Sequence, residues 1–204
     1  MYGRIITSVR LLMGIIYLIS GLNWWFKMIT PYPSISDFVD SAPPPDVVGA
    51  MIENGVLFHL VKATELLTGI ALLANRFVPL MLVAVLPVTI PIFIVDVFFI
   101  AHLRGIVMGA GSLLLNGFLL LAYIGHFRPM LLMRGVPDVG RDAAPVADGD
   151  TFARPLAVML RPLLPVLGVI ALAMGALMLG WLLVMMVQYA INPLPLSALH
   201  PPRP

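Results

Sequence analysis

Two ionisable side chains lie three residues apart in an otherwise apolar stretch, Lys62 and Glu65 in VKATELLTGIALLA. This spacing places both side chains on one face of a helix. A charge inside a membrane span costs about 2.5–3.5 kcal/mol on insertion scales, and pairing removes most of that penalty. The pair is therefore either a self-neutralised structural lock between helices or a proton- or ligand-binding group that faces an internal cavity.

Four further polar side chains interrupt apolar stretches elsewhere in the chain. At a helical rise of about 1.5 Å per residue, Thr89 and Asn116 fall at the depth of the pair, and Asn23 and Asp96 lie nearer the outer face. Matched depth is what an internal polar site requires, although interhelical hydrogen bonds, or water reaching Asp96 at the bilayer rim, would give the same pattern. The candidate ligand-binding residues are Lys62, Glu65, Thr89, Asn116, Asn23 and Asp96.

Other chemistry finds little support in the residues. The chain has no cysteine, which excludes thiolate metal sites and iron–sulfur clusters. Of the four histidines, His59, His102, His126 and His200, only His59 and His102 could meet, so a bis-histidine haem is not expected; either could instead pair with Asp96. No hydrolase, nucleotide-binding or metalloprotease motif stands in a fitting context. We assign no catalytic residue, no metal site and no intrinsic cofactor, and expect at most a bound quinone or lipid.

The composition defines the solvent in which these residues must work. The 204 residues are 60% hydrophobic and 11% charged, with a mean hydropathy of +1.01. Soluble domains carry about 25% charged residues. This composition excludes a soluble enzyme, a disordered protein and a nucleic-acid binder. It predicts an all-α, polytopic membrane helix bundle in contact with lipid.

Five stretches are long and apolar enough to cross a bilayer, which needs roughly 20 residues. The first ends in an aromatic cluster instead of a small-residue cleavage site, so we interpret it as a retained helix and not as a signal peptide. Residues 1–133 would form a four-helix bundle, 134–161 a cytoplasmic linker, 162–191 a fifth transmembrane helix and 192–204 a proline-rich tail. The expected spans are Ile5–Trp25, Gly55–Ala74, Phe77–Ile100, Gly105–Gly125 and Leu163–Tyr189.

The basic residues predict the orientation of these spans. With the N-terminus in the cytoplasm, eight arginines fall on the inner side and three basic residues on the outer side. We therefore expect a bacterial inner-membrane protein with a cytoplasmic N-terminus and an outer C-terminus. The inner set is Arg4, Arg10, Arg76, Arg128, Arg134, Arg141, Arg154 and Arg161, and the outer set is Lys27, Arg104 and Arg203.

Prolines mark the third span. Pro87 and Pro91 each remove a backbone donor, which frees the carbonyls of Val83 and Pro87 and predicts a kinked or partly unwound turn near the membrane centre. Because freed carbonyls in lipid need partners, this turn should face the protein interior, where Thr89 would satisfy one of them. The turn is either a packing kink or a broken helix that coordinates a ligand.

Small residues predict where helices approach closely. Gly14 and Gly21 share one face of the first span, and Gly105, Gly109 and Gly111 line the fourth. The fifth span carries two small-residue pairs, Ala171/Gly175 and Ala176/Gly180. These pairs serve either packing within the chain or docking to another membrane subunit. The fifth span, which has no ionisable residue, is the best candidate for a contact with other membrane subunits.

Two segments resemble the DoxX-like family of small bacterial membrane proteins. They are GLNWWFK, from Gly21 to Lys27, and the stretch from Lys62 to Ile90 with its Arg-Phe-x-Pro-Leu turn. The resemblance covers about 4–133 and implies a four-helix bundle, in a family linked to quinone-coupled sulfur oxidation and to membrane redox defence. The family's Pro-Val-Thr segment is usually followed by an Asn and then a His, whereas this sequence has Pro91 and Asp96 there.

Three functions are compatible with these observations. The first, which we favour, is an accessory or scaffold subunit of a larger, redox-related membrane complex. The second is a quinone- or small-molecule-binding subunit of a membrane oxidoreductase, in which Glu65 would take part. The third is a small-solute or proton carrier, which the prolines of the third span support only weakly and which the missing repeat symmetry disfavours.

Overall fold

The computed structural model describes residues 2–26, 28–29, 54–101, 103–131, 158–160 and 162–193. Within these ranges there is no β-strand, and five helices are long and apolar enough to span a membrane, as the sequence predicts. The expected ends agree to within a few residues. In chain order the elements are α1 (Tyr2–Phe26), α3 (Leu57–Ala74), α4 (Val78–Ile94), the π-helix η2 (Val95–Ile100), α5 (Leu103–Ala122), the 3-10 helix η3 (Ile124–Leu131) and α7 (Leu164–Ile191).

Glycines set the distance between α1 and α3. A Cβ placed on Gly69 of α3 would lie 2.6 Å from the backbone nitrogen of Leu18, and one on Gly21 of α1 would lie 2.8 Å from that of Leu66. No side chain fits between backbones this close, so only glycine is compatible with the contact. The order of these contacts along the two helices shows that α1 and α3 are antiparallel.

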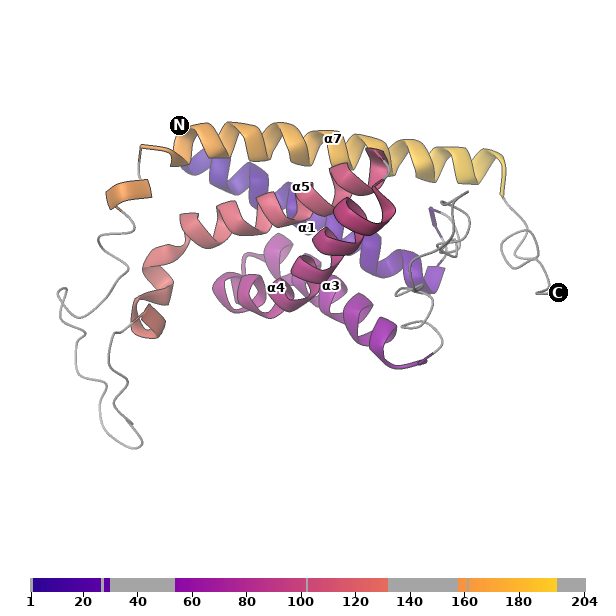
Figure 1. The fold of residues 1–204 in the computed structure, drawn as a ribbon, viewed down its shortest axis with the longest axis horizontal. Helices are drawn as coiled ribbons and strands as arrows, with labels where there is room; N and C mark the ends of the chain where they lie inside the picture. The colour runs from indigo at the N-terminus through magenta and orange to yellow at the C-terminus, as the bar shows by residue number, and fades with distance from the viewer. Residues whose placement is uncertain are drawn as a thin grey trace.

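Helix α7 packs on α1 and α5, on the side of the bundle away from α3 and α4 (Figure 1). Its contact face contains Gly168, Ala171 and Gly175, all buried. A Cβ on Gly168 would meet Ile5, and one on Gly175 would meet Leu12, so α7 runs parallel to α1. The Ala171/Gly175 pair therefore serves packing within the chain, one of the two alternatives that the sequence allowed.

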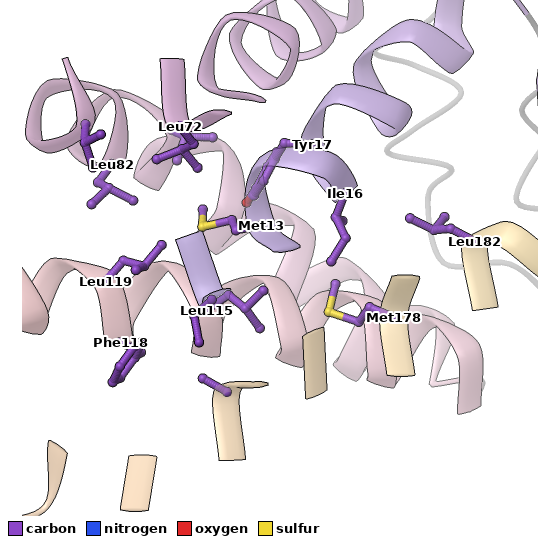
Figure 2. Close-up of a cluster of buried hydrophobic side chains, with 14 of the residues drawn as sticks. Met13, Ile16, Tyr17, Leu72, Leu82, Leu115, Phe118, Leu119, Met178 and Leu182 are labelled. Atoms are coloured by element: carbon purple, nitrogen blue, oxygen red, sulfur yellow. The ribbon is translucent and has the colours of Figure 1, made fainter. Parts of the chain in front are cut away.

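The centre of the bundle is an apolar cluster to which every long helix contributes. Figure 2 shows Met13 of α1 between Leu72 and Leu82 on one side and Leu115 and Leu119 on the other, and all five side chains are almost completely buried. Many large apolar side chains on the outer faces are exposed, as in Leu67, Phe98 and Val184. The chain is thus apolar both inside and outside, which is the pattern of a bundle surrounded by lipid.

The third span corrects the expectation about its prolines. Helix α4 continues without a break through Pro87 and Pro91, and both rings are exposed on the outer surface. Thr89 is completely buried, and its hydroxyl donates to the carbonyl of Val85 at 3.1 Å, not to either freed carbonyl. The prediction of a partly unwound, interior-facing turn is therefore wrong, whereas the alternative of a packing kink stays a prediction.

The reason for this difference is rotational. Side chains follow one another by about 100° around a helix, so Thr89 points away from the face that Pro87 and Pro91 share. Only one of the two faces can contact the core, and α4 presents the face with Thr89 and Val85. The departure from α-helical geometry comes later, at Val95–Ile100.

Several predicted segments lie wholly or largely outside the described residues. They are the first outer loop, the linker at 134–161 apart from a helical turn at 158–160, and the tail from residue 194. The domain boundaries assigned to the linker and the tail therefore stay predictions.

Candidate functional site in the bundle interior

Lys62 and Glu65 form an ion pair inside the bundle. Lys62 Nζ lies 2.8 Å from Glu65 Oε2, and the two residues are 5% and 2% exposed. Ser20 of α1 closes the arrangement, since its hydroxyl donates to Glu65 Oε2 at 2.7 Å and accepts from Lys62 Nζ at 3.1 Å. The predicted pairing on one helix face is confirmed, and the two charges neutralise each other within a triangle of hydrogen bonds.

The glycine contact between α1 and α3 positions this triangle. Gly21 follows Ser20 directly and touches the backbone at Leu66, the residue after Glu65. The helices must approach this closely for a short serine side chain to reach the carboxylate. The sequence analysis missed Ser20; its position next to an interfacial glycine was the signal that could have found it.

Aromatic rings lie beside Lys62. Lys62 Nζ lies 5.4 Å from the centroid of the Phe58 ring, within the range of a cation–π interaction. The Trp24 ring packs edge-on against both Phe58 and His59, at 4.7 Å and 5.1 Å between centroids. The ammonium group is therefore held by a carboxylate, a hydroxyl and an aromatic face together.

A second hydrogen-bonded cluster joins three helices. Tyr17 of α1 and Thr89 of α4 are linked through their hydroxyls at 2.8 Å, and Asn116 Nδ2 of α5 donates to Thr89 Oγ1 at 3.4 Å. All three residues are buried, with Thr89 and Asn116 completely so. The prediction placed Thr89 and Asn116 at one depth, and the structure brings them together. Tyr17, which the sequence analysis did not select, connects them to α1.

The two clusters are neighbours. Tyr17 and Ser20 lie three residues apart on α1, hence on one face, and the charges of Glu65 and Lys62 both act on Tyr17. We refer to the six residues as the interior polar network. They are Tyr17, Ser20, Lys62, Glu65, Thr89 and Asn116.

Asn23, expected in a second tier of interior groups, is buried beside the end of α1. Its Oδ1 accepts a hydrogen bond of 2.7 Å from the backbone N–H of Ile29. This bond ties the chain that follows α1 back to the helix. This bond is local in sequence, and the expected role of Asn23 between helices or at a ligand stays a prediction.

Asp96 lies in η2, half-buried, with its backbone carbonyl bonded to the N–H of Ala101 at 3.2 Å. A Cβ on Gly109 would lie 2.8 Å from the Asp96 Cβ, so α5 passes directly behind this side chain. The charges of Lys62 and Arg104 both act on it. Asp96 is thus packed against α5. The side chain of His102, one expected partner, lies outside the described residues, and His59 is exposed against Trp24.

Arg10 was assigned to the inner flank of the first span, but it lies inside the bundle. Helix α1 begins at Tyr2, so Arg10 is more than two turns from its start, and the residue is 8% exposed. Its Nε has no hydrogen-bond partner. An arginine near a span end normally extends toward the headgroups, so its type and position gave no sign of burial.

The described residues contain no group of three histidine or carboxylate side chains that could hold a metal ion. What the network offers is a set of hydroxyl, amide, carboxylate and ammonium groups in a water-poor interior. Such a set can bind a neutral, hydrogen-bonding molecule, hold a proton, or fix helices to one another.

Comparison with known proteins gives a family for the first half of the chain. Residues 5–103 match the family model for DoxX, which confirms the resemblance over that stretch. No curated protein and no solved structure matches the chain. The match contains α1, α3 and α4 and ends where α5 begins, so Asn116 and α7 lie beyond it. The protein is therefore a membrane protein with a DoxX domain at residues 5–103.

Proposed function

We propose that the protein is an accessory, non-catalytic subunit of a larger, redox-related complex in the bacterial inner membrane. The observation that carries this proposal is the division of α7 into two faces. One face, with Gly168 and Gly175, is filled by the chain's own α1 and α5. The opposite face contains the small residues Ala176 and Gly180, both exposed, and a Cβ on Gly180 would meet nothing within 4 Å.

The outward face supports a docking role because a small-xxx-small pair lets a second helix approach closely. The pair is not needed for the fold of the chain itself, since Gly168, Ala171 and Gly175 already make the internal contacts of α7. The family's link to membrane redox systems supplies the expected type of partner. The partner would be another helical membrane subunit.

Affinity purification in a mild detergent tests this role. Wild-type protein should bring down a partner in a fixed ratio, and Gly180→Leu should lose most of it while keeping its own elution profile. Ala190→Leu, exposed on α7 but nearly three turns beyond the pair, is the matched control and should retain the partner. A monodisperse, partner-free protein in several mild detergents would contradict the proposal.

A second candidate function is binding of a quinone or a similar small molecule. Glu65 favours it, because a carboxylate at the centre of a membrane span, in reach of a lysine and a serine, is a group that can exchange a proton with a bound ring. Glu65→Gln should then weaken quinone binding measured in nanodiscs, while insertion and helicity stay normal. Thr68→Val removes a buried hydroxyl bonded only within α3 and is the control. Unchanged binding in Glu65→Gln would end this version.

The orientation forms part of the proposal, with the N-terminus in the cytoplasm and the C-terminus outside. The absence of cysteine makes it simple to test. A single cysteine at Arg4 should resist a membrane-impermeant maleimide in intact spheroplasts, and one at Asn192 should react. The opposite labelling pattern would reverse the assignment.

A further inference from the structure

One polar atom of the interior polar network is left without a partner. Asn116 is completely buried, and its Oδ1 accepts no hydrogen bond. Burying a polar group that has no hydrogen-bond partner is unfavourable, and exposing the same group to lipid is unfavourable too, because lipid offers no partner either. A group of this kind normally has an ordered water or a ligand beside it.

The hydrogen bonds around Thr89 determine which end of the amide is open. The single hydroxyl proton of Thr89 goes to the carbonyl of Val85 at 3.1 Å. Thr89 Oγ1 can therefore only accept from its other neighbours, so the hydroxyl of Tyr17 and the amino group of Asn116 both donate to it. The Asn116 amide must then direct its carbonyl oxygen away from Thr89, and the open position requires a donor.

The surroundings of the open position are polar enough to hold a small molecule. Ser112 lies one helical turn before Asn116 on α5, hence on the same face of that helix, and the hydroxyl of Thr89 contacts the Asn116 amino group. A bound molecule that donates to Asn116 would thus have further hydroxyl groups in its neighbourhood. An internal water needs two to four such partners.

We propose that Asn116 Oδ1 binds an O–H group, supplied either by an internal water molecule or by a hydroxylated, lipid-soluble molecule. This site is the terminal member of the chain Tyr17–Thr89–Asn116 and lies on α5, outside the matched DoxX stretch. The assignment stands independently of the accessory role of α7 and of any role of Glu65.

The test uses the full chain purified into nanodiscs and separates the two sources. Infrared spectra recorded in H2O and in H2¹⁸O detect a bound water as an isotope-sensitive O–H stretch. Organic extraction and mass spectrometry detect a hydroxylated molecule that co-purifies at one per chain. We expect one of these signals in the wild type and its loss in Asn116→Leu.

Two controls keep the result interpretable. Thr68→Val removes a buried hydroxyl that bonds only to the carbonyl of Thr64, and it should leave the signal unchanged. Asn116→Leu should be compared with the wild type only after both give the same elution profile; if it does not fold, the wild-type spectra alone decide. The proposal is wrong if the wild type shows no isotope-sensitive band and no co-purifying molecule. It is also wrong if the signal persists in folded Asn116→Leu.

Discussion

The α1–α3 interface and the α4–α5 interface both bury polar side chains, and they treat them differently. Between α1 and α3, Ser20, Lys62 and Glu65 form a triangle in which each group meets the other two. Between α4 and α5, Asn116 uses its amino group and leaves its carbonyl oxygen open. The first arrangement is complete without any further molecule, whereas the second requires one. The polar group that lacks a partner is therefore Asn116, and not the charged pair.

The largest expected effect comes from opening the triangle. Lys62→Met leaves Glu65 in the bundle without its counter-charge, and we expect a loss of about 3–5 kcal/mol in the free energy of unfolding. The double variant Lys62→Met/Glu65→Leu replaces both charges with apolar groups and should recover most of that loss. Reversible unfolding in mixed SDS–detergent micelles measures both. A double variant as unstable as the single one would contradict a structural role for the pair.

A smaller effect is expected from separating the backbones at the same interface. Gly69→Leu must displace α1, because a Cβ at this position already lies 2.6 Å from the nitrogen of Leu18. Overpacking of this kind costs about 1–3 kcal/mol, occasionally more. Gly180→Leu, at a position with open space around it, should change the same measurement by less than about 0.5 kcal/mol. Equal effects of the two variants would show that the glycine contact is unimportant for stability.

The smallest effect is expected at the hydrogen bond between Tyr17 of α1 and Thr89 of α4. A double-mutant cycle of Tyr17→Phe and Thr89→Val should give a coupling of about 1 kcal/mol, the usual net value of one buried hydrogen bond. The same cycle with Tyr17→Phe and Thr68→Val, whose hydroxyl bonds elsewhere, should give a coupling near zero. If neither cycle shows a coupling, the hydrogen bond between Tyr17 and Thr89 does not stabilise the bundle.

The fold could be predicted from the sequence because length and hydropathy alone determine membrane spans. The five spans and the Lys62–Glu65 pair follow from spacing within single helices, and both are found in the structure. What could not be predicted is how each helix is rotated about its axis. Tyr17 costs little to place in a span, so nothing marked it as a partner, and Ser20 was marked only by its position beside the interfacial Gly21. Arg10 gave no sign that it turns inward.

Depth along the membrane was a partial guide to the site. It brought Thr89 and Asn116 together correctly, because residues at one level on neighbouring helices have few other places to go. It also placed Asn23 among the interior groups, and Asn23 is buried, with a hydrogen bond to Ile29 that is local in sequence. In α4 the prolines and Thr89 lie on opposite faces, and only one of these faces can contact the core. Which face does so depends on packing against the other helices.

The π-helical segment Val95–Ile100 has a consequence for how this part of the chain can vary. A turn closed by a bond from residue i+5 holds one residue more than an α-helical turn, so it behaves as a single-residue insertion absorbed within the helix. The surplus residue rotates the chain that follows Asp96, on the way into α5, whereas Thr89 and Asp96, seven residues apart, share one face of the helix with or without it. Deleting Val97 should therefore restore the regular winding after Asp96 and rotate Phe98 and Phe99 about the helix axis, while Thr89 and Asp96, both upstream of the deletion, keep their register.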